Sequence, residues 1–405
     1  MSKLRSLIIK ACTTVVPGFG KMGAPFGQLL KTSELLTRSF SSEQQKTIGK
    51  SDFNSHFIGN KLGIKSVACS NSTLAVCDEL WTNSEKYTSQ TAYALSQSTP
   101  NSDLYKALET SIANAITMAK DGVHDAQFKI SAHIHIVAFA VADVEDHICS
   151  VRRRLGLSLS SPITTIILQQ GCSGILTALD LAKLLVSGFP EPEKENVLIT
   201  SENNMMLSAH QRFPFIERPN GINSWLWGAI FGEGVGAMIV SGSEKNLPLG
   251  VSWKIDLLER ETIENDWRVK LESQEAGYST VSIRAREVSD TYMRGVSKHA
   301  KIAIDLAGGL DNIFRVCFHE SNPMLLEKVS QSVGVNLNIV PTLSAEVGTL
   351  ACVSSFTLLE KSTQEFKLLA SQGKPLLEAK KLVFSIIGEA GGRVDVGHMV
   401  LSPVI

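Results

Sequence analysis

The sequence lacks a strong net charge, a long apolar run and a cleavable leader. Its 405 residues include 39 basic and 40 acidic side chains, for a formal net charge of -1, so no overall field attracts nucleic acid or an anionic membrane. No run approaches the roughly 18 apolar residues needed to span a bilayer. Because Lys10 interrupts the first apolar run, residues 7–16 read as a first core strand, not a signal peptide. These absences favour a soluble cytoplasmic protein.

Cysteine pairs and metal-ligand clusters are also missing. The seven cysteines are odd in number, scattered, and form no CxxC pair, which favours reduced thiols in a cytoplasm over a disulfide framework. His133 and His135 would point to the same face of an apolar strand, but no third ligand accompanies them. We therefore expect buried or edge histidines and no bound metal.

What is present is an alternation of short β-branched runs with longer segments of helical periodicity, typical of an α/β fold. Strands are expected at 132–141, 163–168, 196–200, 237–241, 313–318 and 381–387, and helices at 104–120, 174–185, 290–307 and 352–372. Polar surface loops are expected at 41–55 and 83–103, and a functional loop at 203–227, which mixes Pro, Gly and aromatics. A boundary between two halves is expected near residue 248.

The most informative window surrounds Cys172 in Gln-Gly-Cys-Ser-Gly. An apolar strand stops at Gly171, and an amphipathic helix starts just after Cys172. Free N–H groups and the helix dipole at such a position favour a thiolate, and the glycines let a substrate carbonyl approach the backbone. An isolated cysteine is more often a small buried residue, but this turn has the layout that covalent catalysis needs.

Two further windows carry possible chemistry. The segment 229–240 holds Gly232 and Gly234 before a strand, and without a following helix and Lys it is not a phosphate-binding loop. The segment Val316-Cys-Phe-His319-Glu-Ser-Asn322 ends a strand and enters a helix. Its imidazole can serve as general acid, base or hydrogen-bond donor. His319 is 319 minus 172, or 147, residues after Cys172, so any pairing of the two must be tertiary.

In order and spacing, these windows resemble the ketoacyl-ACP synthase III family and its thiolase-superfamily relatives, over roughly residues 104–405. The family has a Gly-Cys-x-Gly elbow, a Phe-Gly-Asp-Gly-Ala-Gly-Ala segment and a His-Gln-Ala-Asn motif. The resemblance implies a five-layered αβαβα sandwich built from two similar halves. Residues 1–248 would carry the nucleophile Cys172 and residues 249–405 would carry His319, in a homodimer.

At the third catalytic position the sequence departs from the family. The family's Gly-Asn-Thr-Ser segment corresponds to Leu343 to Phe356, which contains no Asn, and Val347 falls at the Asn position. The missing amide donor argues against decarboxylative condensation. Glu346 is the candidate third catalytic residue through His319, with a surface or structural glutamate as the alternative. Glu320 stands where the family often has Gln.

The resemblance also implies a substrate site without a bound cofactor. Its expected backbone and side-chain members are Gly171, Gly232, Gly234, Asn322 and Gly391, the last from a C-terminal glycine-rich loop. The acyl donor would be a coenzyme A or carrier-protein thioester. The family's Trp and Arg that clamp coenzyme A have no clear counterpart in residues 56–65, so both donors stay open.

Three functions remain in competition. The favoured one is an acyltransferase of fatty-acid-like or specialised metabolism that forms an acyl-thioester on Cys172 and passes the acyl group to an acceptor. The second is a decarboxylating ketoacyl synthase, and the third is a noncatalytic partner subunit of an active homologue. None of them involves nucleic acid or a membrane.

Overall fold

The computed structural model describes residues 6–34, 57–82, 102–138, 144–157, 163–204, 230–263, 269–273, 279–283, 285–372, 380–390 and 393–405. The strands are β1 (Leu7–Val15), β2 (Gly27–Lys31), β3 (Ser66–Ser70), β4 (Lys129–Val137), β5 (Thr164–Gln169), β6 (Glu195–Asn203), β7 (Gly234–Ser241), β8 (Ser252–Ile263), β9 (Val269–Ser273), β10 (Ser279–Ile283), β11 (Ile313–Phe318), β12 (Lys381–Ala390) and β13 (Arg393–Val404).

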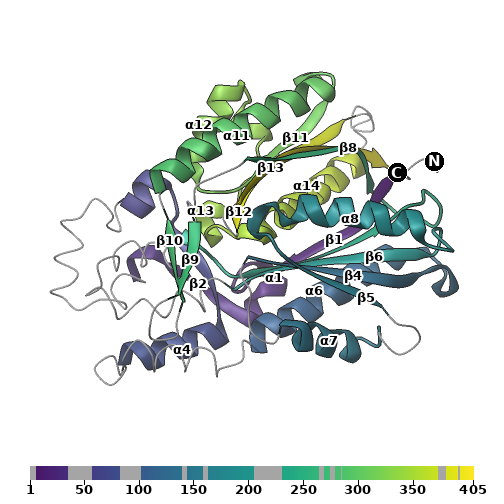
Figure 1. The fold of residues 1–405 in the computed structure, drawn as a ribbon, viewed down its shortest axis with the longest axis horizontal. Coiled ribbons are helices and arrows are strands. Elements are labelled where there is room, and N and C mark those ends of the chain that lie inside the picture. Colours follow the sequence, from purple (N-terminus) through teal and green to yellow (C-terminus); the bar gives the residue numbers. More distant parts are fainter. Residues whose placement is uncertain are drawn as a thin grey trace.

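The helices are α1 (Gly20–Gly23), α4 (Asn71–Thr82), α6 (Ser102–Lys120), α7 (Val144–Arg154), α8 (Gly174–Gly188), α11 (Ala285–Leu306), α12 (Pro323–Val333), α13 (Ser344–Val347) and α14 (Ser354–Ser371). Shorter or irregular turns are η1 (Ala24–Phe26), η2 (Phe57–Leu62), η4 (Asp125–Gln127), η5 (Gly171–Ser173), η6 (Leu310–Asn312), η7 (Leu337–Ile339) and η8 (Ala351–Val353). Figure 1 shows their arrangement.

Nine strands form one mixed sheet in the order β11-β12-β13-β8-β1-β7-β6-β4-β5. β4 runs parallel to β5 and β6, and β11 runs parallel to β12. The N-terminal and C-terminal strand sets join where β1 pairs with β8, at Leu7–Ile9 opposite Trp253–Ile255. The expected boundary at 248 lies in the connection between β7 and β8.

Three apolar clusters define the layers. One packs α6 and α7 against β1, β6 and β7, and another packs α11 and α12 against β11, β12 and β13. The largest lies between, where α8 and α14 contact the inner faces of both strand sets. Adjacent strand residues serve different layers: Leu198 belongs to an outer cluster and Ile199 to the central one, as the period of two requires. The layer order is αβαβα, as the sequence resemblance implies.

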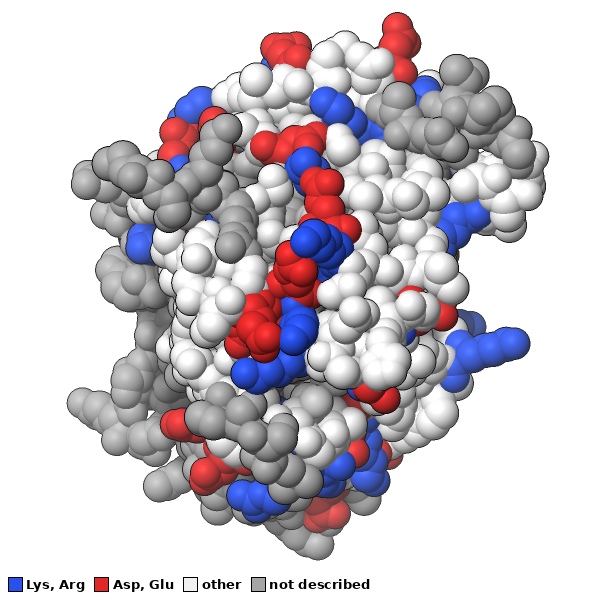
Figure 2. Space-filling view, turned by 90° about the vertical axis from the view of Figure 1, so that its right-hand side faces the viewer, with Lys and Arg blue, Asp and Glu red and all other residues white. Residues whose placement is uncertain are grey.

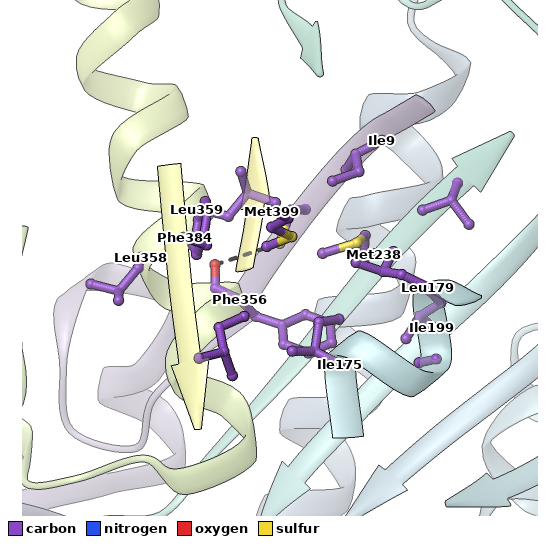
Figure 3. Packing of buried hydrophobic residues seen from close by; sticks show 14 of the residues in the cluster. Ile9, Ile175, Leu179, Ile199, Met238, Phe356, Leu358, Leu359, Phe384 and Met399 are labelled. Atoms are coloured by element: carbon purple, nitrogen blue, oxygen red, sulfur yellow. Dashed lines mark hydrogen bonds between the residues drawn. The ribbon is translucent and has the colours of Figure 1, made fainter. Parts of the chain in front are cut away.

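The central layer buries the helix that follows Cys172. Figure 3 shows Ile175 of α8 beside the ring of Phe356 of α14, and Leu179 of α8 in the same cluster near Met238 of β7. The segment Gly171–Gly188 is long and apolar enough by composition to cross a membrane, which differs from the expectation that no run approaches this length. Half of this segment is buried inside the protein. Its apolarity is explained by packing on several sides, as in the core helix of a large domain.

Most elements expected from periodicity are present. β11 has the expected bounds, and β5, β6, β7 and β12 overlap their expected segments; β4 begins three residues earlier, at Lys129. β8 lies outside the strands expected from the sequence, and its second half, up to Ile263, is rich in charge. Four consecutive side chains, Glu259 to Thr262, are exposed, so this part of the strand has no alternation of apolar and polar residues. Of the expected loops 41–55, 83–103 and 203–227, the structure describes only the ends: residues 102–103 begin α6 and Asn203 ends β6.

Surface charges are balanced on the face that Figure 2 presents, where acidic and basic side chains lie side by side in a narrow stripe without a broad area of one sign. Ion pairs such as Lys245 with Glu193, at 2.6 Å, and Lys254 with Glu244, at 2.8 Å, illustrate this mixing. Exposed pairs of this kind contribute little to stability.

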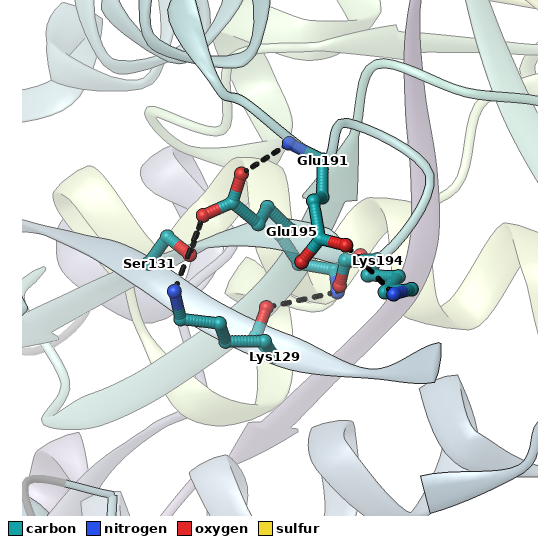
Figure 4. A network of polar contacts seen from close by, with 6 residues as sticks. Lys129, Ser131, Glu191, Lys194 and Glu195 are labelled. Atoms are coloured by element: carbon teal, nitrogen blue, oxygen red, sulfur yellow. Dashed lines mark hydrogen bonds and ion pairs between the residues drawn. The ribbon is translucent and has the colours of Figure 1, made fainter. Parts of the chain in front are cut away.

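A polar cluster fixes the start of the parallel strands. The Glu195 carboxylate accepts hydrogen bonds from the backbone N–H of Glu191 at 2.9 Å, from Ser131 Oγ at 2.9 Å and from Lys129 Nζ at 3.3 Å (Figure 4). These contacts join the connection before β6 to the first residues of β4. They lie at the amino ends of these strands, whereas Cys172 follows the carboxyl end of β5.

Candidate active site

Cys172 lies in the short turn η5 between β5 and α8. Gly171 opens the turn with φ +51°, a left-handed conformation that favours glycine. The turn is packed closely: a Cβ atom on Gly174 would lie 2.5 Å from Ile136 Cγ2. Cys172 itself is partly exposed, while Gly171 and Ser173 are buried. The expected strand-to-helix elbow is therefore present.

The thiol is not activated in the resting protein. Burial raises the pKa of Cys172, and the nearby Cys352 raises it further. The sequence led us to expect a thiolate at the start of the helix, and here the desolvation cost outweighs the helix terminus. Because the resting form is a thiol, covalent chemistry requires a base that removes its proton.

His319 follows the last residue of β11 and is buried. Its backbone N–H donates to the carbonyl of Ser385 in β12 at 2.8 Å, and its carbonyl accepts from the Tyr292 hydroxyl of α11. Burial lowers the pKa of His319 to about 4, so the imidazole is neutral near pH 7. Its Nδ1 has no hydrogen-bond partner among the described residues. A neutral ring fixed through its backbone can accept a proton.

β12 connects the two candidate residues. Ser385 contacts the backbone of His319, and three residues later Gly388 contacts η5: a Cβ atom on Gly388 would lie 2.1 Å from Ser173 N. His319 and the turn that carries Cys172 therefore both contact the same short stretch of β12, from Ser385 to Gly388. Gly391, the glycine expected to approach the site, lies outside the described residues.

The segment around Gly232 packs beside the stretch that replaces the family's Asn. A Cβ atom on Gly232 would lie 1.9 Å from the carbonyl oxygen of Val347, and the Gly232 N–H donates to Thr349 O at 3.1 Å. Gly234 begins β7, close to Leu350. Val347 is completely buried and apolar, so it supplies no side-chain donor. Both glycines permit close backbone packing.

Glu233, between these glycines, has a structural set of partners. Its carboxylate accepts from the Ser70 N–H at 2.6 Å and from Thr73 Oγ1 at 2.8 Å, at the start of α4. Asn322 likewise caps a helix: its Oδ1 accepts from the Leu325 N–H at 3.0 Å at the start of α12. These bonds satisfy free N–H groups of the helix termini.

The two glutamates that the sequence singles out, Glu320 and Glu346, have different surroundings. Glu346 is exposed on α13, whereas Glu320 is buried. Glu320 Oε1 accepts from Thr342 Oγ1 and the Leu343 N–H, both at 2.6 Å, and from the Ser344 N–H at 3.0 Å. Burial raises the pKa of Glu320 against these bonds. Glu346 is the sequence candidate for a third catalytic residue, with a surface glutamate as the alternative, and the contacts of Glu320 fix the segment before α13.

A buried polar cluster that the sequence does not predict surrounds Thr200 of β6. Thr200 Oγ1 contacts His133 Nε2 at 2.6 Å and His135 Nδ1 at 2.8 Å, and both rings are fully buried, as expected. The Glu202 carboxylate lies 3.8 Å from His135 Nε2, and burial raises the pKa of Glu202 to about 7. Cys352 Sγ donates to the backbone carbonyl of Glu202 at 3.1 Å. The one sequence feature that points to this cluster is Cys352, a second cysteine in a turn that leads into a helix, α14.

Solved structures share this architecture over the whole chain. A variant of CsyB matches with a TM-score of 0.70 and 16% identity, covering 99% of this chain and 100% of that one. The chain has the thiolase fold. OleA of Xanthomonas campestris matches with a TM-score of 0.68 and 14% identity, covering 99% and 100% of the two chains.

A third solved structure with the same architecture is that of a named synthase. The 3-oxoacyl-[acyl-carrier-protein] synthase III of Aquifex aeolicus matches with a TM-score of 0.63 and 15% identity, covering 98% of this chain and 99% of that one. No protein-family model and no curated protein sequence matches the chain. At these identities the thiolase-fold likeness establishes architecture, and the chemistry must be argued from the residues.

Proposed function

We propose that the protein is an acyltransferase in which Cys172 accepts an acyl group from a thioester donor and passes it to an acceptor. The observation that carries the proposal is the partly exposed Cys172 on a strand-to-helix elbow, joined through β12 to a neutral, buried His319. The solved structures that share the fold include condensing enzymes, which supports the same general chemistry.

In the first step the Cys172 sulfur attacks the thioester carbonyl carbon. A new carbon–sulfur bond forms, the donor's carbon–sulfur bond breaks, and His319 passes the proton of Cys172 to the departing thiolate. In the second step an acceptor hydroxyl or amine attacks the acyl-cysteine, His319 takes its proton, and the Cys172 thiolate leaves and is reprotonated. The neutral ring suits both transfers because a base must be unprotonated when it acts.

Transfer to oxygen or nitrogen is favoured over decarboxylative condensation. Val347 at the position expected for the family's Asn is buried and apolar, so the amide that would stabilise a developing oxyanion is missing. A coenzyme A thioester is the preferred donor, because CsyB binds CoA-SH and OleA binds lauroyl-CoA in the solved structures. A carrier-protein thioester is the alternative.

The assembly we propose is a homodimer in a reducing cytoplasm. β5 is an edge strand of the sheet, and its Ile167 is 37% exposed, which fits burial against a second copy. Six described cysteines are free thiols, which fits a compartment that keeps thiols reduced.

The decisive experiment is intact-protein mass spectrometry after incubation with acyl-coenzyme A and acyl-carrier thioesters. We expect an adduct equal in mass to the acyl group in the wild type and none in Cys172→Ala. Cys149→Ala is the matched control, since Cys149 is also a partly exposed free thiol. Absence of any adduct in the wild type would leave the noncatalytic partner subunit as the better explanation. Carbon dioxide release from a malonyl thioester would instead identify condensation.

A further inference from the structure

The turn that carries Cys172 has a counterpart in the C-terminal half of the chain. Cys172 is the second residue of η5, which leads into α8, and Cys352 is the second residue of η8, which leads into α14. Each turn opens with a left-handed residue, Gly171 at φ +51° and Ala351 at φ +44°. Neither helix has a side-chain cap on its first residues. The two thiols occupy equivalent positions.

The backbone conformation of Ala351 indicates that the surrounding structure enforces this second turn. Among the described residues it is one of two non-glycine residues with positive φ, the other being Asn246. A Cβ atom makes this conformation unfavourable for an L-residue. Backbone strain of this kind persists only where the surroundings enforce it and is concentrated at functional positions. The strain sets the direction of the residue that follows, Cys352.

The two turns are in contact with each other. η5 packs against η8, and Cys172 packs against the central apolar cluster that contains Cys352. Cys352 also contributes to the raised pKa of the Cys172 thiol. A disulfide requires Cα atoms within roughly 7 Å, and the packing of η5 against η8 makes Cys352 the candidate partner of Cys172. Both thiols are free in the structure.

The thiols differ in access. Cys172 is partly exposed, whereas Cys352 is 1% exposed and donates to the carbonyl of Glu202. A small oxidant therefore reaches Cys172 first, and Cys352 lies behind it. A buried thiol leaves no room for an acyl chain, so transfer of the acyl group to Cys352 does not fit, but a disulfide needs no additional space.

We propose that Cys172 and Cys352 form a reversible disulfide when the protein meets a peroxide, with Cys352 as the resolving thiol. His319 takes the Cys172 proton and the thiolate attacks a peroxide oxygen; the O–O bond breaks, Cys172 becomes a sulfenic acid, and the proton leaves with the departing oxygen as an alcohol or water. The Cys352 sulfur then attacks the Cys172 sulfur, the S–S bond forms, and the hydroxyl leaves as water with the Cys352 proton. A dithiol reductant reverses the bond. The disulfide would occupy the nucleophile and protect it from further oxidation.

The test is peroxide treatment of the intact protein, alkylation of the remaining thiols under denaturing conditions, and peptide mapping by mass spectrometry. We expect one cross-linked peptide pair joining Cys172 and Cys352, lost after dithiothreitol. In Cys352→Ala and in Cys352→Ser, Cys172 should instead proceed to sulfinic acid that dithiothreitol does not reverse. Cys317→Ala, which removes another buried free thiol, should keep the cross-link.

Two results would overturn the proposal: a wild-type Cys172 that reaches sulfinic acid as fast as in Cys352→Ser, or a cross-link to another cysteine. The loss of acyl transfer on oxidation rests on the proposed function, but the cross-link does not. A protein that forms the disulfide and no acyl adduct would refute the acyltransferase alone, and one that forms the adduct and no disulfide would refute this inference alone.

Discussion

The backbone of Gly388 lies directly against the backbone of Cys172: a Cβ atom on Gly388 would come within 2.9 Å of the Cys172 carbonyl carbon and within 2.1 Å of the next nitrogen. Both contacts are with backbone, which cannot move aside as a flexible side chain can. Glycine at this position therefore allows β12 and the elbow to meet.

Gly388→Ala should displace the elbow. We expect a loss of about 1–3 kcal/mol in the free energy of unfolding, the usual cost of overpacking, and a slower acylation of Cys172. Denaturant unfolding and time-resolved mass spectrometry measure the two effects. Gly188→Ala is the control, because a Cβ atom there has no neighbour within 4 Å. Equal behaviour of the two variants would contradict the proposed contact.

The elbow and the histidine could be predicted because each depends on a local pattern. Gly171 permits the turn and an apolar helix follows it, so the sequence around Cys172 carries its own conformation. His319 comes at the end of a β-branched strand that periodicity identifies with its exact bounds. Layering followed from the alternation of strands and helices.

The remaining site contacts are tertiary and left no local signal. The C-terminal glycine-rich segment was expected to approach the cysteine, but only the register of β12 shows that Gly388 makes the contact. Glu320 and Glu346 could not be separated by sequence, since burial decides between them. The raised pKa of Cys172 depends on desolvation by the whole core, which no short window contains.

The pH dependence of acylation should reflect a histidine that is neutral throughout the working range. With its pKa lowered to about 4, His319 stays unprotonated from pH 5 upward. The acylation rate should therefore show no inflection near the ordinary histidine value of about 6.5. A rate profile from pH 5 to about 9 measures this, with loss of rate expected for His319→Gln by about 100-fold or more. An inflection near 6.5 that disappears in His319→Gln would refute the neutral resting base. His124→Gln changes an exposed histidine and serves as control.

Substitution of Glu320 should lower the free energy of unfolding, whereas substitution of Glu346 should not. Glu320→Ala leaves three donors without their acceptor, so we expect a loss of about 2 kcal/mol or more in unfolding free energy. Glu320→Gln keeps Oε1 and should recover most of it. Glu346→Gln should leave stability and the acylation rate unchanged because its side chain is exposed. A large rate loss in Glu346→Gln without a stability change would restore Glu346 as the third catalytic residue.

The buried histidine pair should make Thr200 important for stability. Thr200→Val removes the hydroxyl that contacts both His133 and His135, which leaves ring nitrogens without a partner in the core. Such groups cost about 1–3 kcal/mol each. Urea unfolding at pH 7 measures the loss. Thr117→Val, on an exposed helix position, removes only a bond to a backbone carbonyl and should change stability little. Similar losses in both variants would refute the role of the pair.

Lys10 should reduce stability at neutral pH. It lies at the irregularity between Ile9 and Ala11 in β1, is 2% exposed, and its Nζ has no partner among the described residues. Burial lowers its pKa from 10.5 to about 8. Since the unfolded chain holds this proton more tightly, the free energy of unfolding should rise as pH increases from 8 toward 10.5.

Lys10→Met should remove this cost. The shift from 10.5 to about 8 corresponds to roughly 3 kcal/mol, so the variant should gain up to about that amount at pH 7. The gain should shrink as pH rises from 8 toward 10.5, because the folded-state amine is then largely neutral and the unfolded-state amine begins to lose its proton. Urea unfolding of both proteins at pH 7 and pH 10 tests this, with Lys21→Met as an exposed control. A gain that is equal at both pH values would mean that Met improves packing and that the charge of Lys10 is not the cause.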